Sequence, residues 1–496
     1  MPSSLSNPSW TRGRAMIATT VLLAALALRV GVLGNRDLWY DELLSANFSA
    51  HGPWRTLVTV ARFDVHPPLY YIQLSLWMTF GASKAWIMAN SVAWSFTAVV
   101  LALWVGVRRF GVEAGLWAAA LLAVCPAALA YADQARMYPM LSALILLVFE
   151  AQARWLEKEG PVSTVAMILS QLVLAYSHAI GAFMLLGCLA FTFVQLLLRR
   201  EPRRLVVWLV VEALIGAASV PALIFGMAHA VTHTAVPNLA SFGAAVAFLA
   251  TGAARSGVLW IAAAGAASAL VVWISTRRWE TTIMLACLVL TPLVAAAVVS
   301  LVARPIWIER IFTPLTPLAC LILGRAATLA DGRRVRAAVG AIVLFWAAVS
   351  ILDSGWRPRG DGYGPSARWL RAQALPGDMI VVRDPMTFWA LMWSLEGHTW
   401  GEPLADQFSN DRWRRLIDKL PGGLRSMLAD RRTPHSPIPG VEARLLAPGE
   451  AWPEPKGRLF VVRSATFEPP PVGLDAPPGV EKPPLEIRTR DARPGL

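Results

Sequence analysis

The chain has 496 residues, of which 56% are hydrophobic and only 16% are charged. That composition is too apolar for a soluble globular protein and indicates an integral membrane protein. The net charge of +13 does not indicate a nucleic-acid partner. Its arginines gather in short gaps between apolar runs, where the positive-inside rule places them on the cytoplasmic side of a membrane.

Runs of about 17–25 apolar residues predict the helices that cross the bilayer. We expect about eleven of them, near residues 15–33, 86–107, 112–131, 139–156, 163–177, 180–198, 205–227, 257–275, 281–302, 311–328 and 337–352. Two shorter stretches, 68–80 and 239–250, are more typical of interfacial or re-entrant helices. The alternation of arginine-rich gaps puts the N-terminus inside, and an odd number of spans then sends the C-terminal part outside.

Composition predicts two domains. Residues 1–352 hold nearly all the long apolar runs and predict an all-α polytopic membrane domain. Residues 353–496 are polar and have the size of one ordinary domain. Short helix and strand patterns there predict an exoplasmic α/β accessory domain, which ends in a Pro-rich tail from Pro469.

The first predicted outer loop, at about 34–85, carries an acidic motif. Trp39-Tyr40-Asp41-Glu42 follows directly on the first apolar run. Carboxylates held at the edge of a membrane are costly and mark function more often than they do in a soluble loop. The structural alternative is a solvated pair that caps a short helix.

A second polar cluster, Asp64-Val65-His66-Pro67-Pro68, follows in the same loop. The two prolines stop one helix and begin the next, with Asp64 near the N-cap. That turn does not exclude a direct role, because Asp64 can bind a metal ion or an acceptor. His66, neutral at pH 7, can ligate a metal ion or donate to a phosphate.

Two arginines lie at predicted outer ends of spans, against the positive-inside trend. Arg136 precedes the fourth span and Arg310 precedes the tenth. A guanidinium group suits bidentate contact with phosphate, although such a side chain also snorkels to lipid headgroups. Tyr138 and Glu309 are weaker candidates of the same kind, and Asp133 offers a carboxylate without a DxD pattern.

Histidines and cysteines give no clear metal pattern. The four cysteines fall inside apolar runs without CxxC spacing. His178, His229 and His233 are scattered near predicted outer ends and are more typical of polar fillers than of a metal site.

Taken together, the motifs resemble the GT-C class of integral-membrane glycosyltransferases. Within it the pattern is most similar to the bacterial relatives of protein O-mannosyltransferases and lipid A aminoarabinose transferases. The resemblance covers roughly residues 15–330. It rests on Arg29, Leu38-Trp39-Tyr40-Asp41-Glu42 with Ser45, Asp64-Val65-His66-Pro67-Pro68-Leu69-Tyr70-Tyr71, Phe80-Gly81-Ala82-Ser83, Gln134-Ala135-Arg136-Met137-Tyr138, and Glu309-Arg310-Ile311-Phe312 with Pro314 and Pro317.

This resemblance implies transfer of a sugar from a polyprenyl-phosphate donor to an envelope acceptor, which is a lipid, a polysaccharide or a protein. The reaction would occur on the outer face of a bacterial inner membrane, with inversion. The implied roles are Asp41 as general base with Glu42 as its alternative, Asp64 and His66 for the acceptor or a metal, and Arg136, Tyr138 and Arg310 for the donor phosphate.

The sequence leaves open a metal cofactor and two alternative functions. A divalent metal ion on Glu42, Asp64 or His66 is left open, and no organic cofactor is expected. The main alternative function is a transporter or flippase of lipid-linked sugars, although the two halves of the chain show no repeat of the kind that transporters commonly have. A non-catalytic membrane subunit would leave both loop motifs unexplained.

Overall fold

The structure is a computed structural model. It describes residues 10–228, 279–329, 363–396, 435–446, 452–464 and 485–490, apart from short gaps at 32, 34–35, 51, 304 and 383–384, and some residues of 236–245 and 337–346. The predicted span 257–275 lies outside the described residues. So do most of 337–352, half of 239–250 and most of the tail.

Contacts divide the chain into two compact units, and neither is continuous in sequence. The helical unit comprises Met1–Leu33, Val65–Tyr70 and Met88–Arg357. The loop unit comprises Gly34–Asp64, Tyr71–Ile87 and Pro358–Leu496. Most of the predicted first loop therefore groups with the C-terminal residues, whereas composition had placed it with the membrane domain.

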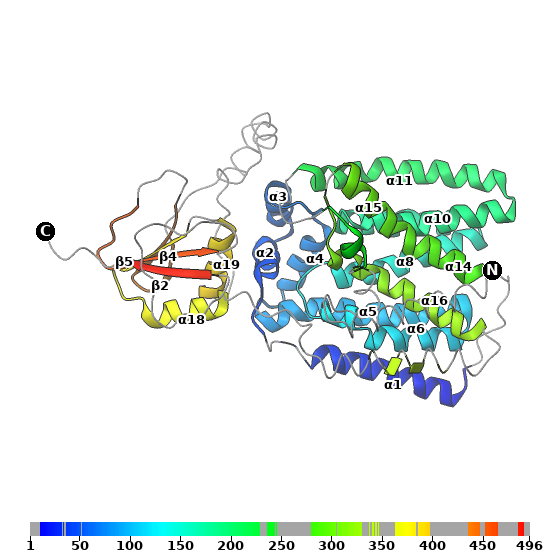
Figure 1. The fold of residues 1–496 in the computed structure, drawn as a ribbon, viewed down its shortest axis with the longest axis horizontal. Coiled ribbons are helices and arrows are strands. Elements are labelled where there is room, and N and C mark those ends of the chain that lie inside the picture. Colours follow the sequence, from blue (N-terminus) through cyan, green and yellow to red (C-terminus); the bar gives the residue numbers. More distant parts are fainter. Residues whose placement is uncertain are drawn as a thin grey trace. The chain divides into compact units, whose positions relative to one another are not determined.

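The helical unit is a bundle of long apolar helices, seen in blue, cyan and green in Figure 1. Its elements are α1 (Arg12–Val30), α5 (Lys84–Phe110), α6 (Val112–Val124), α7 (Pro126–Ala130), α8 (Tyr138–Glu157), α9 (Pro161–Ser177), α10 (Gly181–Arg199), α11 (Pro202–Ala228), α14 (Trp279–Leu285), the π-helical turn η1 (Ala286–Leu290), α15 (Thr291–Val302), the 3-10 turn η2 (Glu309–Leu315) and α16 (Thr316–Leu329).

Among the described residues, seven helices are long and apolar enough to cross a membrane. Helix α9 is also apolar but shorter. The predicted span 112–131 is wrong as one helix, because the chain breaks at Cys125, before Pro126, and divides it into α6 and α7. Proline lacks the N–H that would have continued the helix.

Glycines let three of the helices approach closely. A Cβ atom on Gly115 of α6 would lie 2.6 Å from the carbonyl oxygen of Leu103 in α5. A Cβ atom on Gly324 of α16 would lie 2.5 Å from the carbonyl oxygen of Ala114 in α6. Small residues of this kind set the packing distance between membrane helices. They fix α6 between α5 and α16.

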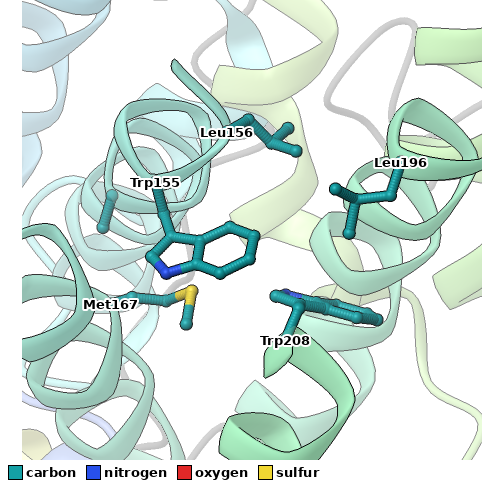
Figure 2. Packing of buried hydrophobic residues seen from close by; sticks show 6 residues of the cluster. Trp155, Leu156, Met167, Leu196 and Trp208 are labelled. Atoms are coloured by element: carbon teal, nitrogen blue, oxygen red, sulfur yellow. The ribbon is translucent and has the colours of Figure 1, made fainter. Parts of the chain in front are cut away.

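A second part of the bundle core is aromatic. Trp155 of α8 packs with Met167 of α9, Leu196 of α10 and Trp208 of α11 (Figure 2). Beside it, the Gln152 amide and the Gln171 amide both donate to Glu212 Oε1, at 2.8 and 2.9 Å. Polar contacts of this sort hold membrane helices together where lipid supplies no hydrophobic driving force.

The loop unit combines short helices with a mixed sheet. The helices are α2 (Tyr40–Ser49), α3 (Pro53–Phe63), most of α4 (Leu69–Met78), α18 (Tyr363–Gln373) and α19 (Pro385–Glu396). The strands are β1 (Met379–Val382), β2 (His435–Ile438), β3 (Val441–Leu445), β4 (Leu459–Ser464) and β5 (Leu485–Arg490). They form one sheet in the order β2-β3-β1-β4-β5.

Strand β1 is the buried centre of this sheet. It pairs in parallel with β3 and β4, so that Ile380 lies opposite Ala443 on one side and Phe460 on the other. The outer strands β2 and β5 are antiparallel to their neighbours. Strand β5 belongs to the stretch that we expected to be a Pro-rich tail, and it pairs with β4 along its whole length.

Candidate anion-binding site and acidic loop

Four segments of the helical unit bring cationic and polar side chains together. His66 lies in the turn before α4, Arg136 and Tyr138 lie at the start of α8, His178 follows α9, and Arg310 lies in η2. Arg136, Tyr138 and His178 are buried, whereas His66 and Arg310 are partly exposed. Sequence had predicted four of these residues as binding residues and had set His178 aside.

The two histidine rings are in contact. The ring centroids of His66 and His178 are 4.2 Å apart with an interplanar angle of 32°. The Tyr138 ring lies 6.3 Å from His178 and packs edge-on against Tyr131 at 5.2 Å. The turn of His66 is thereby held against the ends of α8 and α9.

Hydrogen bonding fixes the tautomer of His178. The backbone N–H of Ile180 donates to His178 Nδ1 at 2.9 Å. An acceptor nitrogen carries no proton, so in the neutral ring the proton lies on Nε2. His178 therefore offers an N–H donor at Nε2.

Both histidines stay neutral at physiological pH. Although His66 keeps some exposed surface, its ring nitrogen Nδ1 is buried. This burial lowers the pKa of His66 well below its ordinary value, and the charges of Arg136 and Arg310 lower it further. The pKa of His178 is lowered in the same way, first by burial, then by His66 and the two arginines. The positive charge of the cluster is therefore carried by two permanent guanidinium groups.

The start of α8 adds to the positive electrostatic potential of this cluster. Its first turn contains Tyr138 and Pro139, and a helix N-terminus carries about half a positive charge with N–H groups directed outward. Negative groups, phosphate above all, bind favourably at such a terminus. Two arginines, a neutral histidine donor and a helix N-terminus together suit a phosphate group.

Arg136 is placed by the loop between α7 and α8. The side-chain amide of Gln134 donates to the Ala130 carbonyl at 2.9 Å, and the Arg136 backbone N–H donates to the Gln134 carbonyl at 2.6 Å. Asp133, Gln134 and Arg136 are all nearly buried. This loop is therefore packed into the bundle.

Arg29, the arginine at the end of the first span, anchors the segment before that loop. It is fully buried and donates to the carbonyls of Leu122 and Ala123, each at 3.1 Å, where α6 ends. A cation at a helix C-terminus is stabilising. Its Nε also donates to Ser95 Oγ at 2.8 Å. A cavity of about 10 Å³ beside it is lined by Tyr131 and Thr313, roughly the room of one water molecule.

In the loop unit, the adjacent carboxylates of Asp41 and Glu42 have different surroundings. Glu42 is fully buried, and the Arg36 guanidinium group donates hydrogen bonds to both of its carboxylate oxygens, at 2.6 and 2.7 Å. The Trp39 backbone N–H donates to Glu42 Oε2 at 2.9 Å, so this side chain also caps the first turn of α2. Asp41, in the same turn, is partly exposed. Glu42 thus supports the helix, and Asp41 is the better candidate for chemistry.

Asp64 ends α3 and is bound within the loop unit. The Tyr71 hydroxyl donates to Asp64 Oδ2. Tyr71 is fully buried and its ring packs against Phe48 of α2 at 5.9 Å. This contact ties the end of α3 to α2 and α4.

A metal ion does not fit the surroundings of Glu42 or His66. Both oxygens of Glu42 already bind Arg36, and His66 lies in the field of two arginines that would repel a cation. Within the described ranges, no group of three or more His, Cys, Asp or Glu side chains is placed to hold a metal.

Comparison with solved structures shows the GT-C glycosyltransferase fold, which confirms the resemblance seen in the motifs. One similar structure is the apo crystal structure of ArnT from Cupriavidus metallidurans. It matches with a TM-score of 0.59 and 13% identity, over 96% of this chain and 98% of that one. At this identity the likeness establishes the fold alone. With the seven long apolar helices, it defines an integral membrane protein.

Two further likenesses are too weak to carry an argument. Archaeal oligosaccharyltransferase AglB from Archaeoglobus fulgidus, in complex with an inhibitory peptide and a dolichol-phosphate, gives a TM-score of 0.46 at 10% identity over 91% of this chain and 70% of that one. Arabinosyltransferase EmbB from Mycobacterium smegmatis gives 0.43 at 14% identity over 86% and 40%. No model of a known protein family matches the chain, and no curated protein sequence matches it.

Proposed function

We propose that this protein transfers a sugar from a polyprenyl-phosphate donor to a hydroxyl group of an envelope acceptor, on the outer face of a bacterial inner membrane. The observation that carries the proposal is the convergence of Arg136, Arg310 and His178 at the N-terminus of α8, in a chain with the GT-C fold.

In this proposal the cluster binds the donor phosphate. The two guanidinium groups supply charge and bidentate hydrogen bonds, and His178 Nε2–H and the Tyr138 hydroxyl supply neutral donors. The same groups stabilise the phosphate as it leaves, because its negative charge grows while the bond to the sugar breaks. A phosphate leaving group needs little help from a general acid.

The acceptor needs a base, and Asp41 takes that role. The acceptor oxygen attacks the anomeric carbon, its proton passes to the Asp41 carboxylate, and the carbon–oxygen bond to the polyprenyl phosphate breaks. One displacement of this kind inverts the configuration at carbon. General-base assistance contributes about 10²–10⁴-fold to such a rate. Asp64 and the turn of His66 are proposed to contact the acceptor.

The test uses purified protein, a radiolabelled polyprenyl-phosphate sugar and an envelope extract, beside a liposome assay for flipping. Wild type should label the extract and should not flip the donor. Arg310→Ala should raise the donor KM at least about tenfold, since a charged hydrogen bond is worth about 1.5–3 kcal/mol. Arg310→Lys should recover part of that loss, because it lacks the guanidinium fork.

The matched control is Arg203→Ala, which removes an exposed arginine from the first turn of α11. It should leave the donor KM unchanged. Flipping of the donor by wild type without any transfer would contradict the proposed function. An unchanged donor KM in Arg310→Ala would contradict the phosphate-binding role of the cluster.

A further inference from the structure

Helix α19, from the C-terminal side of the sequence, is buried at nearly every position whose side chain the structure describes. It packs on β1 and β2 as well as on α2. Its residues Phe388, Leu391, Met392 and Leu395 are at most 2% exposed. Helix α2 is buried in turn at every position from Glu42 to Ser49. The helix that carries Asp41 is thus packed by a segment from the far end of the chain.

A second contact lies just before α2, at Asp37. Its carboxylate accepts from Lys84 Nζ and from Arg368 Nη1, each at 3.2 Å. It also lies so close to Gly364, in the first turn of α18, that a Cβ atom at position 364 would overlap it. A negative charge is favourable at the N-terminal turn of a helix. Asp37 therefore joins the loop before α2 to the start of α18.

An aromatic pair continues this contact into α2. Tyr40, the first residue of α2, stacks on Tyr363, the first residue of α18, with ring centroids 6.3 Å apart and an interplanar angle of 26°. Tyr363 is only 3% exposed. The residue next to Tyr40 is Asp41. The first turn of α18 thus touches residues on the N-terminal side of the proposed base.

Charge contributes only modestly to this contact. The Arg368 side chain is 66% exposed, and exposed ion pairs contribute only about 0–1 kcal/mol. Partial burial pushes the pKa of Asp37 upward, but Lys84 and Arg368 outweigh this and hold the pKa below its ordinary value. The close approach of Asp37 to Gly364 and the stacked rings make the contact specific.

We propose that α18 and α19 position the catalytic helix α2, and that Asp37 is the positioning residue that sets the first turn of α2 through α18. This inference rests on the proposed function, since it takes Asp41 as the base. The C-terminal residues then act on the rate of the chemical step without touching the substrate.

The test applies Asp37→Ala and Gly364→Val to the full chain, because they break the same contact from its two sides. Both should raise amide hydrogen exchange in residues 40–49. Both should lower kcat at least tenfold and leave the donor KM within twofold of wild type. The control is Arg371→Ala, which removes an exposed cation later in α18 and should change neither quantity. Asp37→Asn, which keeps the shape, should give an intermediate effect.

The double variant Asp37→Ala with Gly364→Val should change amide exchange and kcat little more than either single substitution does, as is usual for two residues in one contact. Unchanged exchange in residues 40–49 in both variants would overturn the proposal. Raised exchange with an unchanged kcat would overturn it as well. The exchange measurement needs no activity, so a chain that transfers no sugar would refute the proposed function and still report on this contact.

Discussion

Asp41 and Glu42 are adjacent and carry the same charge, but they differ in burial and in their hydrogen-bond partners. Helical geometry turns Glu42 back toward Arg36 and the Trp39 N–H, and it leaves Asp41 partly exposed in the first turn. Any sequence pattern treats the pair as one acidic motif. The structure separates a supporting carboxylate from a candidate base, and the separation predicts opposite outcomes for two isosteric substitutions.

We expect Asp41→Asn to lower transfer at least about a hundredfold, because the amide cannot accept the hydroxyl proton. Thermal stability in detergent and donor binding should stay close to wild type. Glu42→Gln should instead destabilise the protein, since loss of one partner from a buried ion pair costs about 3–5 kcal/mol. Transfer by Asp41→Asn within a few-fold of wild type would show that Asp41 is not the base.

The neutral histidines predict a pH dependence of stability. Because the pKa values of His66 and His178 are lowered in the folded state, the unfolded chain binds protons first as the pH falls. Their contribution to stability is complete above the unfolded value of about 6.5 and is lost as the pH falls through the folded values. Melting temperature in detergent, followed from pH 8 downward, should begin to fall near pH 6.5.

The double substitution His66→Gln with His178→Gln should reduce that acid-dependent loss, and inorganic phosphate should oppose it in wild type. A bound anion near the rings favours their protonated form and so raises their pKa values. Equal pH profiles for wild type and the double variant would contradict the neutral state of the two rings.

At the scale of helices, close packing depends on residues that carry no functional chemistry. We expect Gly115→Val and Gly324→Val to lower stability in detergent by about 1–3 kcal/mol each, the usual cost of overpacking. Gly216→Val in α11 is the control, because a Cβ atom there meets nothing within 4 Å. Thermal unfolding followed by intrinsic tryptophan fluorescence would measure all three. Equal losses in the control and in the α6 and α16 variants would contradict the role of close approach.

The sequence predicted the helices more reliably than their breaks. Long apolar runs are unambiguous, so most predicted spans in the described ranges correspond to helices. The helix break at Cys125 was not predicted because apolar composition continues across it, although Pro126 was a local signal of a break. Strand β5 escaped because the prolines before it hid the alternation of Leu485, Ile487 and Thr489.

The candidate site was predicted only in part, for a physical reason. His66, Arg136 and Arg310 were visible as charged or polar residues at the ends of apolar runs. His178 was not visible in this way, because its place in the site depends on the ring contact with His66, which lies far away in sequence. Arg36 was missed because its partnership with Glu42 depends on how α2 begins. Tertiary contacts of this kind leave no periodic signal.

For the molecule as a whole, we predict a single orientation in the membrane. Reporter fusions after Arg109, Arg200 and Arg278 should be cytoplasmic, and fusions after Asp64 and Asp361 should lie on the opposite side, because the arginine-rich gaps alternate. A cytoplasmic reporter after Asp361 would contradict the exoplasmic placement of α18, α19 and the sheet.

The contact between Asp37 and Gly364 can form only late in synthesis of the chain. Asp37 and its partner Arg368 are 331 residues apart in the chain. At a synthesis rate of about 5–20 residues per second, Asp37 leaves the ribosome roughly 15–70 seconds before α18 exists. During that interval α2 lacks α18 and α19, which pack against it in the finished protein. A nascent chain therefore carries its proposed base in an unfinished loop until α18 has been synthesised.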